Sequence, residues 1–156
     1  PNLMALDAKV ELKSMQGIRT LSLEEFILGN RKTAKKQDEL VSNIFVPHPG
    51  KNAFGNFEKL GTRAYLVISI VMVGVVAELN EQDEILNLKV AVGACSPVAQ
   101  RLRLLEKECV GQRLKSIEIH PKHLELLDPI DDVRASANYR NAVVPELLKR
   151  AITGVV

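Results

Sequence analysis

The sequence predicts an α+β fold, because segments with a strand pattern fill the first part of the chain and segments with a helical pattern fill its end. Residues 6–13 alternate apolar and polar side chains, as a half-buried strand does. An apolar segment at 70–79, a polar turn at 80–83 and a second apolar segment at 84–94 predict an antiparallel hairpin. From residue 98 onward the apolar residues recur at helical spacing, which argues against a repeating βαβ plan.

The N-terminal strand forms the first half of another predicted hairpin. A glycine-containing turn at 16–17 joins it to a second strand at 18–22. The basic run at 31–36 is interpreted as a solvated loop, and residues 39–46 after it as a further strand. Pro47 should end that strand, because proline donates no backbone N–H to a sheet.

A short helix is predicted over 23–28, between the hairpin and the basic loop. Ser22 and Glu25 match a capping box, in which each side chain accepts a hydrogen bond from the other residue's backbone N–H. Gly29 favours the end of this helix, as glycine often does.

The second half of the chain begins with a predicted strand at 54–63 and a helical turn at 64–68, before the apolar hairpin. A helix is expected over 98–110, with Gly111 closing it, and a less regular helix over 116–127.

The last predicted helix covers 133–152 and places its apolar residues on one face. Pro145 lies inside this segment. We expect it to split or kink the helix, and it could serve as the first position of a second helix, because proline removes a backbone hydrogen bond.

Composition excludes several classes of protein. The 156 residues carry a formal charge of +2 with scattered basic residues, so neither nucleic acid nor a membrane surface is expected as a partner. The apolar segment at 64–79 is shorter than the ~20 residues of a bilayer span. Cys95 and Cys109 lack the spacing of a zinc site or a disulfide framework, which favours a reducing, cytoplasmic location. The first residues, 1–12, resemble no signal peptide, and their strand-like pattern suggests that a segment upstream is missing.

An acidic cluster at 128–140 invites a catalytic or metal-binding interpretation. Its spacing lacks the donor pattern of a calcium loop, and we favour a structural role. Asp131 or Asp132 is expected to cap the following helix, and the acids are expected to fix Arg134 and Arg140. In the same segment, Tyr139 is expected to bury its ring and keep its hydroxyl paired.

The remaining chemical candidates are two histidines and a cysteine. His120 and His123 flank a proline and have no matching ligands nearby, so they are interpreted as surface residues. Cys95 lies in no nucleophile motif and is interpreted as a buried small residue. The sequence also lacks a glycine-rich phosphate loop.

Six fragments, read in order, resemble the FAD-binding (medium) subunit of the molybdenum hydroxylases, which include the xanthine dehydrogenases and the aerobic carbon monoxide dehydrogenase flavoprotein. The resemblance runs from about residue 3 to residue 152. The fragments are ALDAKV at 5–10, EEF at 24–26, DEL with IFVP between 38 and 47, FEKLGTR at 57–63, VAVGA with Pro97, and PIDDVRASANYR at 129–140.

The resemblance implies two domains. Residues 1–52 would be the C-terminal part of an FAD-binding α+β subdomain. Residues 53–156 would be the flavoprotein C-terminal domain, a three-stranded antiparallel sheet with packed helices. In the family two glycine-rich flavin loops precede the region where this sequence begins, so this chain alone is expected to bind FAD poorly. Pro145 departs from the unbroken terminal helix that is common in relatives.

The resemblance also implies three flavin contacts. Lys59 matches a lysine near the isoalloxazine ring, Val41 an apolar position that packs near the flavin, and Tyr65 a position where some relatives place an aromatic residue. Each also has a structural interpretation: a solvated lysine, a core valine and a core tyrosine.

The implied function is that of an oxidoreductase subunit in an oligomeric complex. A large molybdopterin subunit would oxidise the substrate, a small subunit with [2Fe-2S] clusters would relay electrons, and FAD would pass them to NAD or another acceptor. The alternatives are a non-catalytic assembly or interaction module that keeps the fold without flavin, and an unrelated hydrolase that uses Cys95 or the acidic cluster.

Overall fold

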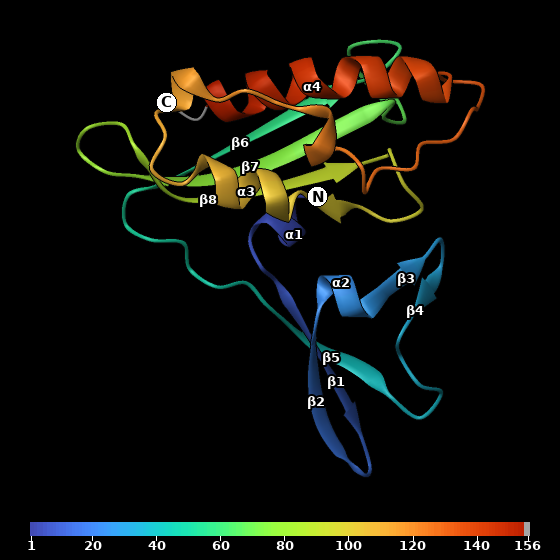
Figure 1. Cartoon of the computed structure of the whole chain (residues 1–156). Coiled ribbons are helices and arrows are strands. Elements are labelled where there is room, and N and C mark those ends of the chain that lie inside the picture. The colour runs from blue at the N-terminus through green and yellow to red at the C-terminus, as the bar shows by residue number, and fades with distance from the viewer. Residues whose placement is uncertain (155–156) are drawn as a thin grey trace.

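The computed structural model describes residues 1–154, which form two main antiparallel sheets and the helices packed on them (Figure 1). The elements of the N-terminal part are α1 (Asn2–Ala5), β1 (Lys9–Ser14), β2 (Gly17–Ser22), α2 (Leu23–Phe26), β3 (Ile27–Gly29), β4 (Lys32–Thr33) and β5 (Leu40–Phe45). Those of the C-terminal part are β6 (Ala53–Leu60), β7 (Val71–Leu79), β8 (Ile85–Gly93), β9 (Gln100–Arg101), α3 (Arg103–Cys109), the 3₁₀ turns η1 (Leu114–Ser116) and η2 (Pro121–His123), and α4 (Ala137–Thr153).

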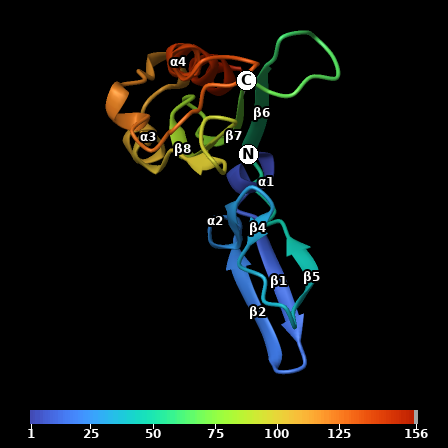
Figure 2. The ribbon, with the colours of Figure 1, turned by 90° about the vertical axis from the view of Figure 1, so that its right-hand side faces the viewer.

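The N-terminal sheet has the strand order β2-β1-β5 and is antiparallel throughout. The predicted hairpin is confirmed, with Lys9 opposite Ser22 and Ser14 opposite Gly17. Val10 and Leu12 are buried on one face of β1, as the alternating pattern predicts. Figures 1 and 2 show this sheet projecting away from the larger C-terminal part.

The predicted capping box is present at the start of α2. The backbone N–H of Glu25 donates to Ser22 Oγ at 3.2 Å, and that of Ser22 donates to Glu25 Oε2 at 2.9 Å. The helix ends at Phe26 rather than at residue 28, so its predicted length was wrong. Residues 27–29 pair instead with β4, which gives their backbone groups sheet partners.

The C-terminal sheet has the order β6-β7-β8-β9. Its three long strands form the antiparallel sheet that the resemblance implied, and β9 adds two residues at the edge of β8. Alternate side chains of β7, from Val71 to Leu79, point into the main core beneath α3 and α4. The opposite face of the same strands packs against α1 (Figure 1).

Three expectations about the connections were wrong. Residues 64–66 form bends and residues 67–68 have no regular structure, so the expected helical turn is absent, and Leu66 has a φ of 49°. The helix expected over 98–110 begins at Arg103, because residues 100–101 pair with β8 as β9. Residues 116–127 contain the 3₁₀ turn η2 rather than a helix.

The terminal helix α4 is unbroken, so the prediction that Pro145 splits it was wrong. Val144, Leu148, Ala151 and Ile152 are fully buried against the sheet. Burial of this apolar face stabilises the helix more than the proline destabilises it, because each buried aliphatic side chain contributes about 1.5–3 kcal/mol against about 3 kcal/mol for an internal proline.

A buried ion cluster connects the N-terminal residues to the C-terminal sheet. Arg101, whose side chain is 3% exposed, donates from Nε to Glu106 Oε1 at 2.6 Å and from Nη1 to Asp7 Oδ1 at 2.5 Å. Arg101 Nη1 also donates to the Met4 carbonyl at 3.0 Å, and Lys89 Nζ lies 2.6 Å from Asp7 Oδ2. These contacts join residues on the two sides of the expected domain boundary at residues 52/53. The boundary itself stays a prediction.

Candidate functional site

The three residues assigned to the flavin by resemblance lie in two places. Lys59 is on β6, and its Nζ donates to the Val67 carbonyl at 2.7 Å. That contact ties Lys59 to the loop at 61–69, in which Tyr65 is 82% exposed. Val41 is on β5 of the other sheet and is 45% exposed. The structure therefore brings Lys59 and the Tyr65 loop together but leaves Val41 apart, and all three assignments stay predictions.

Lys59 shares one face of the C-terminal sheet with a phenylalanine and glycines. The strand register places Lys59 opposite Met72 and Phe57 opposite Gly74. It places Gly55 opposite Val76. Since alternate residues of a strand point the same way, these six residues lie on the face that carries α1. Neither Phe57 nor the glycines were predicted as site residues from the sequence, although the alternation of residues 54–63 already placed Phe57 on the side of Lys59.

The glycines on this face decide how closely α1 approaches. A Cβ at Gly74 would lie 2.8 Å from Asn2 Oδ1 and 3.3 Å from Asn2 N, and one at Gly93 would lie 3.1 Å from Pro1 Cγ. A Cβ at Gly55 would meet only the Val75 carbonyl, at 3.6 Å. Gly74 therefore leaves room for Asn2 of α1, and Gly93 for Pro1 just before the helix, whereas Gly55 leaves an open strip of backbone beside it.

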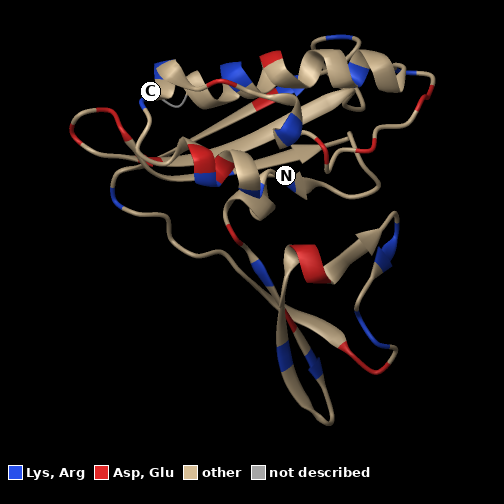
Figure 3. Cartoon of the chain, in the orientation of Figure 1, with Lys and Arg blue, Asp and Glu red and all other residues tan. Residues whose placement is uncertain are grey.

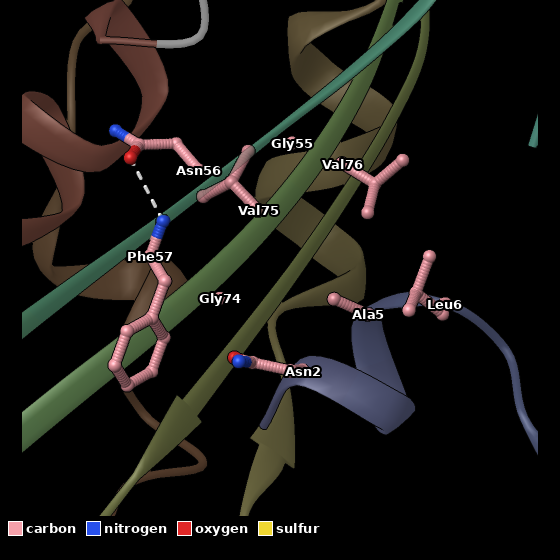
Figure 4. A pocket seen from close by; sticks show the side chains of 9 residues that line it. All are labelled: Asn2, Ala5, Leu6, Gly55, Asn56, Phe57, Gly74, Val75 and Val76. Carbon is pink, nitrogen blue, oxygen red and sulfur yellow. Dashed lines mark hydrogen bonds between the residues drawn. The ribbon is translucent and has the colours of Figure 1, made fainter.

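Hollows flank α1 on this face. One of about 300 Å³ is lined by the residues labelled in Figure 4: Asn2, Ala5, Leu6, Gly55, Asn56, Phe57, Gly74, Val75 and Val76. Figure 4 shows Gly74 between Phe57 and Asn2. The other hollow, of about 410 Å³, also touches Asn2 and Phe57 and is bounded by Met72, Leu23 and Ile27. Most of the lining is apolar, so the face suits a flat, largely apolar group.

Lys59 supplies a positive charge at the end of this face. Its ammonium group forms no ion pair with a carboxylate within residues 1–154, and its neighbour Glu58 belongs to the opposite face of the strand. A cation that is not neutralised by an acid favours negative charge on a group placed nearby.

The acidic cluster has a structural arrangement. Asp131 Oδ1 accepts the Ala137 N–H at 2.5 Å and so caps α4, as predicted for one of the two acids. Ser136 is the N-cap of α4 and its Oγ accepts the Tyr139 N–H, whereas the backbone N–H groups that Asp132 accepts precede the helix, so Asp132 does not cap it. Asp132 instead accepts the Arg134 N–H at 2.8 Å, which together with further contacts lowers its pKa to about 2.

Both arginines of this cluster are fixed by Asp132, as predicted. Asp132 Oδ2 lies 2.6 Å from Arg134 Nη2, and Oδ1 lies 2.8 Å from Arg140 Nη2. Arg140 is 2% exposed and also donates from Nη1 to the carbonyls of Ile70 and Ala94. The expectation for the neighbouring tyrosine was wrong, because Tyr139 is 47% exposed.

The predicted burial of Cys95 is confirmed, and burial raises the pKa of its thiol to about 11. The surface assignment holds for His120 and is wrong for His123, which is 3% exposed. His123 Nδ1 accepts the backbone N–H of His120, so Nε2 donates to Glu108 at 2.9 Å. Within the described chain no group of three His, Cys, Asp or Glu side chains is arranged as metal ligands.

The basic run is largely exposed and lies around β4, where Figure 3 shows its cationic residues. Lys35 Nζ donates to the Glu39 carbonyl, which holds one end of the loop on the start of β5. None of the helices in residues 1–154 is both long and apolar enough to cross a bilayer.

Comparison with protein families gives two matches. Residues 57–155 match the model of the CO dehydrogenase flavoprotein C-terminal domain, and residues 1–49 match that of the FAD binding domain in molybdopterin dehydrogenase. The first match covers more than half of the chain. The chain belongs to the CO dehydrogenase flavoprotein family.

Curated members of this flavoprotein family align along nearly the whole chain. The nicotine 6-hydroxylase medium subunit of Paenarthrobacter nicotinovorans is 27% identical, over 96% of this chain and 53% of its own length. The carbon monoxide dehydrogenase medium chain of Hydrogenophaga pseudoflava is 24% identical, over 96% of this chain and 52% of its own length. The chain thus spans about half the length of the curated relatives it matches.

Solved structures of flavoprotein relatives confirm the fold. CO dehydrogenase from Oligotropha carboxidovorans superposes with a TM-score of 0.84 at 20% identity, covering 99% of this chain and 55% of that one. CO dehydrogenase from Hydrogenophaga pseudoflava gives a TM-score of 0.83 at 21% identity, covering 97% and 53%. The predicted α+β class is therefore correct.

Proposed function

We propose that this chain is the C-terminal part of the FAD-binding subunit of a molybdenum hydroxylase, in which the face that carries Lys59 closes one side of the flavin site. The observation that carries the proposal is the ammonium group of Lys59, which has no carboxylate partner among the described residues and lies at the end of an apolar sheet face that contains glycines, in a chain of this family. FAD would supply the redox chemistry, taking up electrons that reach it and passing them to NAD or another acceptor.

The residues present fit one part of FAD and not another. The open backbone at Gly55 and the ring of Phe57 offer a surface on which a flat ring system can lie. The pyrophosphate needs backbone amides at a glycine-rich helix start, and within residues 1–154 the helix N-caps are Pro1, Ser22, Leu102 and Ser136, none of which follows such a loop. The phosphates would be bound by another part of the complete subunit.

Each of the assigned residues would have a distinct part. Lys59 would favour the negative charge that develops when the flavin is reduced, because a nearby cation stabilises an anion. Tyr65, exposed on the loop held by Lys59, would cover the ring. Val41 would contact the flavin from the other sheet. That role requires the rest of the FAD-binding domain to extend across both sheets. The partners would be a large molybdopterin subunit and a small [2Fe-2S] subunit, in a cytoplasmic complex.

A flavin absorbance spectrum tests the proposal. The chain alone should be colourless, whereas the chain joined to the part of the nicotine 6-hydroxylase medium subunit that lies outside the aligned region should retain FAD. In that joined protein, Lys59→Gln should make the flavin potential more negative by on the order of 30 mV, since 30 mV corresponds to 1.4 kcal/mol for a two-electron couple. Lys115→Gln, at an exposed lysine of η1, is the matched control.

A joined protein without flavin would reject the proposal and favour the non-catalytic assembly role. Equal potentials for the two lysine variants would reject the role of Lys59 while leaving FAD binding intact.

A further inference from the structure

The charged residues that join the two sheets carry opposite signs on the two sides of the junction. The acids, Asp7 and Glu24, belong to the N-terminal part. The cations that bind them all belong to the C-terminal part: Lys89, Arg101 and Arg103. Both acids and both arginines help to line a hollow of about 330 Å³ between the two parts. The junction is therefore held together by electrostatic attraction as well as by apolar packing.

Asp7 fixes the direction in which β1 leaves α1. Its backbone has a φ of 53°, and the Ala8 N–H donates to the Leu3 carbonyl at 2.9 Å, which closes the turn after α1. The two carboxylate oxygens bind different cations, since Oδ1 accepts from Arg101 and Oδ2 lies 2.6 Å from Lys89 Nζ. Both the backbone and the side chain of Asp7 are therefore held in place.

Arg101 holds the other side of the junction. Its Nε and Nη2 donate to the two carboxylate oxygens of Glu106, at 2.6 Å and 2.9 Å. Its Nη1 donates to Asp7 and to the Met4 carbonyl at the end of α1. Glu106 Oε1 also accepts the Val90 N–H at 2.8 Å, so β8 and α3 together orient the guanidinium group. The Arg101 side chain, 3% exposed, is thus fixed before it binds Asp7.

The register of the C-terminal sheet connects Arg101 to the face that carries Lys59. Arg101 lies opposite Ala91 of β8, which lies opposite Gly74 of β7. Gly74 in turn lies opposite Phe57 of β6, two residues before Lys59. Because hydrogen bonds join each of these strands to the next, the row behaves as one rigid body. The ion cluster and Lys59 are therefore fixed relative to each other.

Val41 lies on the N-terminal sheet, which projects away from the junction (Figures 1 and 2). It pairs with Leu12 of β1, five residues beyond Asp7 along the chain. At about 3.4 Å per residue this is about 17 Å from Asp7, so a rotation of about 10° at the junction would move Val41 by about 3 Å. A displacement of that size separates a side chain from a ligand that it contacts.

We infer that the ion cluster around Arg101 sets the orientation of the N-terminal sheet on the C-terminal sheet. Asp7 and Arg101 are then positioning residues, which place Val41 and Lys59 at the separation that one flavin requires. The inference rests on the proposed function for the identity of the bound group. The orientation of the two sheets is a property of this chain and can be measured without flavin.

Distances between two spin labels on this chain test the orientation. The labels are attached through Met15→Cys, at the tip of the hairpin of β1 and β2, and through Lys149→Cys on α4, since both positions are exposed. The native Cys95 and Cys109 are buried and should stay unlabelled. Asp7→Asn puts an NH₂ group against a cation, while asparagine tolerates the same φ. Met15 is about 27 Å beyond Asp7, so a rotation of about 10° should shift the mean distance, or widen its distribution, by up to about 5 Å.

Glu24→Gln is the matched control. The side chains of Glu24 and Asp7 are each 39% exposed, but Arg103, the partner of Glu24, is 60% exposed, whereas Arg101 is 3% exposed. Water screens the exposed pair, so its loss should leave the distances unchanged. Arg101→Lys is a second variant of the cluster and should act like Asp7→Asn, because one ammonium group cannot bind both oxygens of Glu106 and also reach Asp7.

FAD titration of the joined protein described above tests the consequence for the flavin. Asp7→Asn should weaken FAD binding more than about fivefold, because the two sheets would no longer be preorganised for the ligand. Glu24→Gln should leave the affinity within about twofold.

Unchanged distances in Asp7→Asn and Arg101→Lys, or equal changes in Glu24→Gln, would overturn the inference. A broad distribution of distances in the labelled chain with the cluster intact would do so too, whether or not the variants fold. Altered distances with unaltered FAD affinity would refute the positioning role. A joined protein that holds no FAD would reject the proposed function, while the label distances would still decide whether the cluster sets the orientation.

Discussion

Replacement of Gly74 by alanine tests whether the glycine face seats α1. The new Cβ would lie 2.8 Å from Asn2 Oδ1, which can rotate away, and 3.3 Å and 3.4 Å from the Asn2 backbone N and Cα, which cannot. Overpacking of this kind costs about 1–3 kcal/mol, and the reduced entropy of the unfolded chain returns about 0.4–1 kcal/mol. We expect Gly74→Ala to lower the free energy of unfolding by about 1–2 kcal/mol.

Gly55→Ala is the matched control, because Gly55 occupies the neighbouring strand on the same face and its Cβ would meet an ordinary contact at 3.6 Å. This variant should be neutral or stabilising by about 0.5 kcal/mol. Urea unfolding gives both values, and in a thermal scan each kcal/mol corresponds to about 2–4 °C for a chain of this length. Equal stabilities of the two variants would refute the close seating of α1. In a double variant with Asn2→Ala, the penalty at Gly74 should shrink, because the two sites are in contact.

Arg140→Met should lower the free energy of unfolding by about 2–4 kcal/mol, because two buried carbonyls and one carboxylate lose their hydrogen-bond donor. Urea titration measures this loss, and a value below about 1 kcal/mol would contradict the central role of Arg140. The pKa of Asp132, which accepts backbone N–H bonds first of all, and that of Glu108, which accepts from a lysine and a histidine, are each lowered to about 2. Their contribution to stability should be complete above about pH 5 and be lost as the pH falls through about 2, which unfolding at a series of pH values measures. Stability that rises on acidification over this range would contradict the assignment. Burial raises the pKa values of Cys95 and Cys109 to about 11, so a thiol reagent at pH 8 should label neither in the folded chain and both after denaturation; rapid labelling of the folded chain would disprove their burial.

Much of the fold could be predicted because its information is local. The Ser22 and Glu25 capping box depends on residues three apart, and the turn at 16–17 joins strands whose patterns are visible in a few residues. The expectations that were wrong concern segments whose structure depends on distant residues. Pro145 was expected to break a helix, and residues 100–101 were expected to be helical, but packing on the sheet and pairing with β8 decide otherwise.

The candidate site divides in the same way. Lys59 was found from the resemblance of FEKLGTR, and its alternation with Phe57 was available in the sequence. The part played by Gly74 was not, because a glycine in an apolar strand shows no sign of what approaches it. Arg101 was missed as well, since its partner Asp7 lies 94 residues away near the start of the chain, although Glu106 lies in the helix that follows it.

The sequence by itself determined the family, the α+β class and the elements whose hydrogen bonds close within a few residues. The tertiary structure alone decided that α1 lies on the glycines of β7 and β8, that Asp132 fixes a buried Arg140 rather than capping α4, and that β5 has an open apolar edge. The physical reason is that burial and strand pairing depend on which segments meet in space, and a pattern of neighbouring residues does not contain that information.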